Sequence, residues 1–69
     1  MLNPYYDARN RICCYADATT GIIEHEYKRV KTRIKLPVGG EYCLERDNTI
    51  TIFRRMEELE FEIERKLIA

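Results

Sequence analysis

Acidic and apolar residues alternate without a break over residues 58–64. Successive side chains of a β-strand point to opposite faces, so a period of two predicts a strand here. Its apolar face carries Leu59, Phe61 and Ile63, and its other face carries only glutamates. Such a row of acids requires either water or a basic neighbour.

A helix over residues 54–69 is the alternative, because Glu, Arg, Lys, Leu and Met are all good helix formers. The helix places Phe61 among glutamates, away from its apolar stripe. It also sets Glu58 and Glu62 at the i, i+4 spacing, at which like charges repel. The strand is therefore favoured over the helix.

A second alternating stretch, residues 29–36, carries the opposite charge. Its two faces consist of Arg29, Lys31, Arg33 and Lys35 on one side and Val30, Thr32, Ile34 and Leu36 on the other. Opposite charges that face each other on neighbouring strands contribute about 0.2–1 kcal/mol per pair. The two rows therefore predict that the acidic strand lies beside the basic strand.

A hairpin is indicated upstream, where residues 11–17 and 22–27 flank a four-residue loop. Gly21 in this loop can take the positive φ that closes a hairpin. The resulting register pairs Ala16 with Ile23, Cys14 with His25 and Ile12 with Tyr27.

After residue 27 the apolar positions shift from odd to even numbers, which predicts a bulge near Lys28 or Arg29 within one bent strand. A further strand is expected over residues 41–45. A three-residue loop, residues 46–48, then returns the chain. This loop pairs Leu44 with Ile50 and Tyr42 with Ile52.

These elements predict an all-β fold, a small antiparallel meander of five to six strands curling toward a barrel. The alternative is an α+β fold in which the meander is followed by the C-terminal helix. Residues 1–9 form an N-terminal arm, and residues 10–69 form a single small β domain. The predicted interior contains Ile12, Cys14, Ile23, Tyr27, Val30, Ile34, Leu36, Tyr42, Leu44, Ile50, Ile52, Leu59, Phe61 and Ile63.

Twelve basic and twelve acidic residues give the 69-residue chain no net charge, so any electrostatic function must be local. Three cysteines, two of them adjacent, argue against a disulfide framework and favour a reducing cytoplasm. We expect no leader and no membrane span, because the sequence shows neither a basic-then-apolar start nor a long apolar run.

Cys14 and His25 face each other in the predicted hairpin, which suggests a Cys/His metal site. Adjacent cysteines in a strand point to opposite faces, however, and C-x-x-C spacing is absent, so Cys13 turns outward and no metal is expected. The sequence offers neither an orienting third group for a nucleophile nor a phosphate-binding glycine motif. We therefore expect no enzyme activity, no cofactor and no small-molecule substrate.

The best binding candidate is the basic strand, residues 28–35, with two aromatic residues near it. The candidate residues are Lys28, Arg29, Lys31, Arg33, Lys35, Tyr27 and Tyr42. Proteins bind single-stranded nucleic acid through such a combination of cations and aromatic rings. If the glutamate row pairs with the basic row, the surface is neutralised, and the zero net charge favours this second interpretation.

Residues 13–21, with residues 36–42 and the Ile-Thr-Ile that follows, resemble small uncharacterised proteins encoded in bacterial conjugative and transposable elements. The resemblance covers residues 13–53 and offers no catalytic or binding residue to transfer. It implies a cytoplasmic accessory role in a mobile genetic element. We expect a non-enzymatic interaction module that binds a protein partner or a second copy. The alternative is a small β-barrel that binds single-stranded nucleic acid or DNA through residues 28–35.

Overall fold

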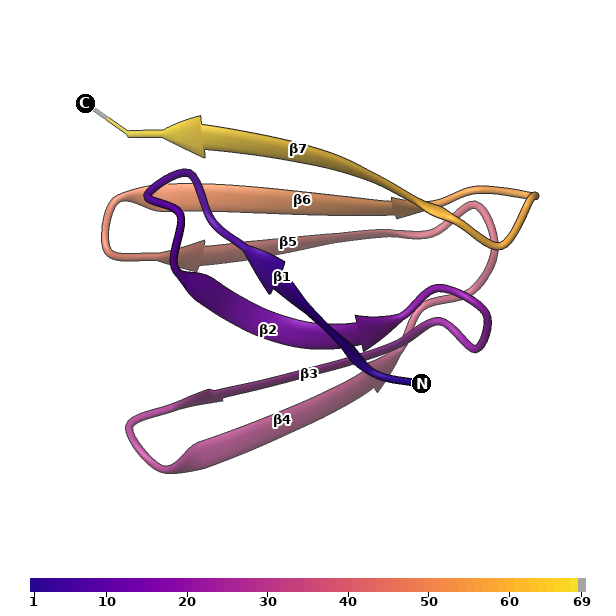
Figure 1. The fold of residues 1–69 in the computed structure, drawn as a ribbon, viewed down its shortest axis with the longest axis horizontal. Helices are drawn as coiled ribbons and strands as arrows, with labels where there is room; N and C mark the ends of the chain where they lie inside the picture. Colours follow the sequence, from indigo (N-terminus) through magenta and orange to yellow (C-terminus); the bar gives the residue numbers. More distant parts are fainter. Residues whose placement is uncertain (69) are drawn as a thin grey trace.

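The computed structural model describes residues 1–68, and Ala69, at the end of the predicted β domain, lies outside them. Every regular element among residues 1–68 is a β-strand (Figure 1). The seven strands are β1 (Asn3–Tyr6), β2 (Ile12–Asp17), β3 (Ile22–Tyr27), β4 (Val30–Lys35), β5 (Glu41–Arg46), β6 (Thr49–Arg55) and β7 (Phe61–Leu67). The all-β prediction is confirmed, and the alternative helix is wrong. Within residues 1–68 no helix is long and apolar enough to cross a membrane.

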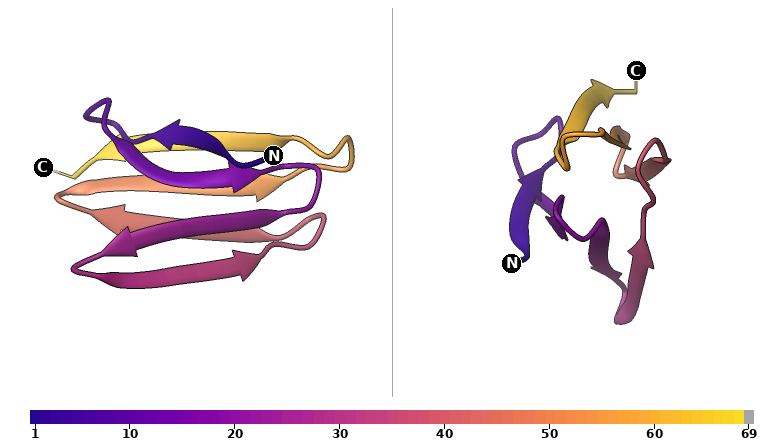
Figure 2. Two further views of the ribbon diagram at one scale, coloured as in Figure 1. Left: turned by 60° about the horizontal axis from the view of Figure 1, so that its bottom comes forward. Right: turned by 90° about the vertical axis from the view of Figure 1, so that its right-hand side faces the viewer.

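The strands form two antiparallel sheets, in the orders β1-β2-β3-β4 and β5-β6-β7. Within each sheet, strands that are consecutive in the sequence pair with each other, and the end-on view in Figure 2 shows both sheets arranged around a common interior. Within residues 1–68 no strand ladder joins the two sheets, so the predicted barrel is not closed. The connection between β4 and β5 contains Pro37, which lacks the N–H that a continued ladder requires.

Residues of the predicted arm supply an additional strand, β1, which pairs with β2 at the sheet edge. The register shifts within this pair, because Tyr5 lies opposite Cys14 whereas Tyr6 lies opposite Ile12. Cys13 is thus the extra residue of a β-bulge. The bulge breaks the strand alternation, so both Cys13 and Cys14 are buried, with 4% and 2% of their surface exposed. The prediction that Cys13 turns outward is wrong for this reason.

The hairpin between β2 and β3 has the predicted four-residue loop and pairs Ala16 with Ile23. Gly21 has a φ of 83°, and a Cβ at this position would collide with the carbonyl oxygen of Leu36. The ladder runs only as far as Tyr15 and Glu24. The two strands separate beyond that point. The predicted pairs of Cys14 with His25 and of Ile12 with Tyr27 therefore do not form.

The predicted bulge after residue 27 is instead a two-residue turn between β3 and β4. Lys28 and Arg29 both have positive φ, 52° and 67°, and Tyr27 pairs with Val30. Two successive residues in the left-handed region form the tight turn that suits a twisted hairpin. The absence of glycine or asparagine concealed this turn in the sequence.

A second two-residue turn, at Asp47 and Asn48, replaces the predicted three-residue loop. Leu44 consequently pairs with Thr51 rather than Ile50, and β6 presents its odd-numbered residues to the interior. The buried residues of β6 are Thr49, Thr51, Phe53 and Arg55, whereas the predicted Ile50 and Ile52 are only partly buried.

The hydrophobic core lies between the two sheets. Its buried members are Cys13, Cys14, Ala16, Ile23, Leu36, Leu44 and Phe53, against which Tyr5, Ile34, Tyr42, Phe61 and Ile63 pack. Four residues that were predicted to be interior are exposed instead, namely Ile12, Tyr27, Val30 and Leu59. Leu59 lies in the turn before β7 with a φ of 58°, so the predicted strand begins later than the alternation suggested.

The acidic and basic rows do not face each other, which corrects the predicted pairing. β7 belongs to the second sheet and pairs only with β6, whereas β4 belongs to the first sheet and pairs with β3. The neighbour of the glutamates is Arg54, whose guanidinium lies 3.4 Å from Glu62 and 3.1 Å from Glu64. Glu64 also pairs with Lys66 at 2.9 Å. The basic row is therefore not neutralised by the glutamate row.

A buried arginine joins the sheets at one end. The Arg55 guanidinium donates hydrogen bonds to the carbonyl oxygens of Ala18 (3.1 Å), Thr19 (2.6 Å) and Leu36 (2.9 Å). These acceptors lie in the loop between β2 and β3 and directly after β4, whereas Arg55 ends β6. The side chain therefore donates to the buried carbonyl of Leu36 and to two more accessible carbonyls of the β2–β3 loop.

Candidate nucleic-acid interface

The basic face of β4 is exposed along its whole length. Lys31, Arg33 and Lys35 alternate with the half-buried Thr32 and Ile34, as the period of two predicts. Alternate residues of a strand lie about 6.6 Å apart, so the three cations form an evenly spaced row. β4 is also an edge strand of its sheet, and among residues 1–68 no strand pairs with its outer side.

Charge is distributed unevenly between this hairpin and the rest of the chain. Residues 22–35 contain five basic and two acidic residues, a formal charge of +3. The remaining seven basic and ten acidic residues give −3, so the zero net charge conceals a separation. In Figure 1 the turn between β3 and β4 and the glutamate-rich turn between β6 and β7 lie at opposite ends of the molecule.

Two glutamates on β3 offset part of the basic face. Glu24 pairs with Arg33 across the ladder, with 3.2 Å between the carboxylate and the guanidinium. Glu26 lies opposite Lys31, but no ion pair forms between them. Within residues 1–68 no ion pair involves Lys28, Arg29, Lys31 or Lys35. These four cations are the charge that is available to a partner.

Tyr27 supplies an aromatic surface at the end of the same hairpin. It is 52% exposed, and its ring lies 5.4 Å from the Lys28 Nζ and 5.2 Å from the Arg46 guanidinium carbon. Cations at such distances are attracted to the face of the ring. Arg46 reaches the site from β5 and also donates a hydrogen bond to the Glu26 carbonyl. Sequence reasoning missed Arg46, because only the arrangement of the two sheets brings it to this hairpin.

Tyr42, the second aromatic residue of the predicted site, points instead to the interior. Its hydroxyl lies 2.8 Å from the Nε2 of His25, and the two rings are stacked. Burial lowers the pKa of His25, and the nearby Arg46 cation lowers it further. Burial also raises the pKa of Tyr42. The structure therefore places neither tyrosine on the basic face of β4. Tyr27 pairs with Val30, so it lies on the opposite face of the hairpin, where Lys28 and Arg46 approach its ring.

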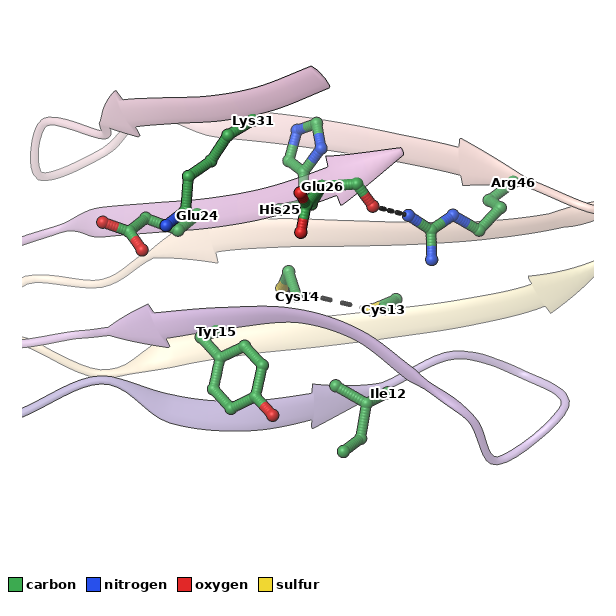
Figure 3. A pocket seen from close by; sticks show the side chains of 9 residues that line it. All are labelled: Ile12, Cys13, Cys14, Tyr15, Glu24, His25, Glu26, Lys31 and Arg46. Atoms are coloured by element: carbon green, nitrogen blue, oxygen red, sulfur yellow. Dashed lines mark hydrogen bonds between the residues drawn. The ribbon is translucent and has the colours of Figure 1, made fainter. Parts of the chain in front are cut away.

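A pocket of about 320 Å³ opens where β2 and β3 separate (Figure 3). Its lining includes Cys13, Cys14, His25, Lys31 and Arg46. Cys14 and His25 thus share a pocket, although the ring nitrogen of His25 contacts Tyr42 rather than a thiol. No group of three or more His, Cys, Asp or Glu side chains that could hold a metal ion occurs among residues 1–68.

Comparison of the chain with models of protein families, with curated proteins and with solved structures yields no match in any of the three.

Proposed function

We propose that the protein is a non-enzymatic interaction module that binds single-stranded nucleic acid through the β3–β4 hairpin. The observation that carries this proposal is the separation of charge, which leaves four cations of the hairpin without an ion pair among residues 1–68. One of them, Lys28, lies over the exposed ring of Tyr27. A cationic groove that follows the phosphates and an aromatic ring on which bases stack are the usual elements of sequence-tolerant single-strand binding.

The hairpin divides the recognition between two kinds of contact. Lys31 and Lys35 extend from the exposed face of β4, where they can approach phosphates of an extended strand. Tyr27 lies at the end of β3, where its exposed ring can stack on a base. The accessory role in a mobile genetic element that the resemblance implies is compatible with such binding.

The test is fluorescence anisotropy with a labelled oligo-dT at several salt concentrations. Each phosphate contact contributes about 0.7 to the slope of log K against log salt for a single strand. Replacing Lys31→Gln and Lys35→Gln together should lower this slope by about 1.4 and weaken binding on the order of 10- to 100-fold at low salt.

The matched control is Arg9→Gln with Lys66→Gln, which removes the same charge from exposed positions outside the hairpin. An equal loss in both double variants, or no binding of the wild-type chain at low salt, would contradict the proposal. If the chain self-associates and only the hairpin variant abolishes that association, the hairpin binds a second copy of the chain. This result would also overturn the proposal of nucleic-acid binding.

A further inference from the structure

The bulge at Cys13 brings two thiols to the same side of β2. Their sulfur atoms are 4.0 Å apart, and both line the pocket between β2 and β3 (Figure 3). In a regular strand adjacent side chains would point in opposite directions. The close pair therefore depends on the irregular pairing of β2 with Tyr5 and Tyr6 of β1.

The two thiols are not equivalent. The hydrogen bond that the thiols share lowers the pKa of Cys13 to about 7, and the Thr51 hydroxyl beside it lowers that pKa further against the effect of burial. The same thiol–thiol contact, together with burial, strongly raises the pKa of Cys14. The thiol–thiol contact therefore favours the thiolate at Cys13, the nucleophilic form, and the protonated thiol at Cys14.

The buried hydroxyl of Thr51 is consistent with this assignment. Thr51 is 1% exposed, and its Oγ1 has no hydrogen-bond partner of good geometry among residues 1–68. A buried donor without an acceptor costs about 1–3 kcal/mol. A negative sulfur at Cys13, or an oxygen bound to that sulfur, would provide the missing acceptor.

We propose that Cys13 and Cys14 form a reversible oxidation site for small hydroperoxides. The Cys13 thiolate attacks one peroxide oxygen, so an S–O bond forms, the O–O bond breaks, and the departing oxygen leaves as an alcohol or water after taking a proton. The sulfur is oxidised to sulfenic acid and the peroxide is reduced. Cys14 then attacks the Cys13 sulfur, the S–O bond breaks, and the released hydroxide takes the Cys14 proton to form water.

The product is a disulfide between adjacent residues, and its geometry makes it easy to reduce. Neighbouring Cα atoms across a trans peptide are about 3.8 Å apart. An ordinary disulfide spans roughly 4.4–6.8 Å between Cα atoms. The linkage is therefore strained, and a thiol reductant should restore the starting state.

The test treats the full chain with stoichiometric hydrogen peroxide and locates the products by peptide mass spectrometry. The expected product is the Cys13–Cys14 disulfide, which dithiothreitol reverses. Cys14→Ala should instead accumulate a dimedone-reactive sulfenic acid at Cys13, and Cys13→Ala should abolish both products. Cys43→Ser removes the exposed cysteine and should leave the reaction unchanged. Wild-type protein oxidised only at Cys43 would overturn the proposal, whatever the folding of the variants.

The role of Thr51 is tested by the pH profile of the reaction. The wild-type rate should rise with a midpoint near pH 7, the pKa of Cys13. Thr51→Val keeps the shape of the side chain but removes the donor, so the midpoint should move to higher pH. A variant profile identical to that of the wild-type protein would contradict a role for this hydroxyl in stabilising the thiolate.

Discussion

Tyr27 combines an apolar ring with a strongly cationic surrounding at the end of β3. Lys28 and Arg46 approach the ring while half of its surface stays open to solvent. A ring held by cations loses little conformational freedom when a base stacks on it, because its orientation is already restricted. The residue is thus the aromatic anchor of the proposed interface.

We expect Tyr27→Ala to weaken oligo-dT binding about 5- to 150-fold, the equivalent of about 1–3 kcal/mol for one stacked base. Tyr27→Phe should bind nearly as well as the wild-type protein, because the ring remains. Tyr15→Ala serves as the control, since Tyr15 is also exposed but lies on β2. Anisotropy titrations at one salt concentration compare the three. Equal losses for the two alanine variants would show that stacking at Tyr27 is not specific.

Asp7 is the residue that closes the turn between β1 and β2. Its buried carboxylate accepts hydrogen bonds from the backbone N–H groups of Arg9 (2.8 Å) and Arg11 (3.0 Å). Burial alone would raise the pKa of Asp7, but these backbone donors and the Arg11 guanidinium more than offset it and hold the pKa below its ordinary value. The charged form is therefore the one that the fold stabilises.

A carboxyl whose pKa is lowered by folding contributes stability that is present above its unfolded pKa, about 3.9, and is lost as the pH falls through the folded value. We expect Asp7→Asn to lower the free energy of unfolding by about 1.5–3 kcal/mol at pH 7, from hydrogen bonds to a charged group. Denaturant titrations should show the gap between wild-type and variant protein closing below about pH 4. A gap that is constant down to acid pH would refute this role of the charge.

At the scale of the elements, turn geometry decides which face of each strand is buried. The period of two predicted the all-β class and most of the strands, but it missed β1, merged β3 with β4 and placed the start of β7 too early. The register was predictable where Gly21 marked the loop, but not at the Lys28-Arg29 turn, which has no glycine. Asp47 and Asn48 carried a usable signal, since both residue types tolerate the left-handed region.

The candidate site was predictable only in part, because strand neighbours depend on contacts distant in the sequence. The basic row could be read from alternation along β4, and it is exposed as that pattern implies. The assignment of β4 and β7 to separate sheets could not be read in this way. Nor could the bulge at Cys13, which arises from its pairing with β1.

Arg55 of β6 connects the two sheets through its side-chain hydrogen bonds. Arg55→Met should remove three hydrogen bonds, one of them to the buried Leu36 carbonyl, so we expect a loss of about 2–4 kcal/mol in the free energy of unfolding. Arg54→Met is the matched control on the opposite face of β6, where the ion pairs are exposed to solvent and should matter much less. Denaturant unfolding measures both. A larger loss for the Arg54 variant would contradict the assigned role of Arg55.

On the scale of the whole molecule, the two halves of the chain correspond to the two sheets. Residues 3–35 make the first sheet, residues 41–67 make the second, and the segment between them is hydrogen-bonded to both. The core lies where the sheets meet, and the β3–β4 turn and the β6–β7 turn lie at opposite ends of the molecule (Figure 1). The proposed binding hairpin and the proposed oxidation site both belong to the first sheet. Arg46, from the second sheet, lies near the Tyr27 ring and also lines the β2–β3 pocket.

The pairing of consecutive strands within each sheet also has an entropic consequence for folding. The cost of closing a loop grows with the logarithm of its length, and the two tightest turns of this chain contain only two residues each. Each hairpin can form without waiting for a distant segment of the chain to arrive. Only one step then requires contacts between distant parts of the sequence, namely the docking of one completed sheet on the other. Residues 36–40 connect the two sheets and so limit the distance over which they must find each other.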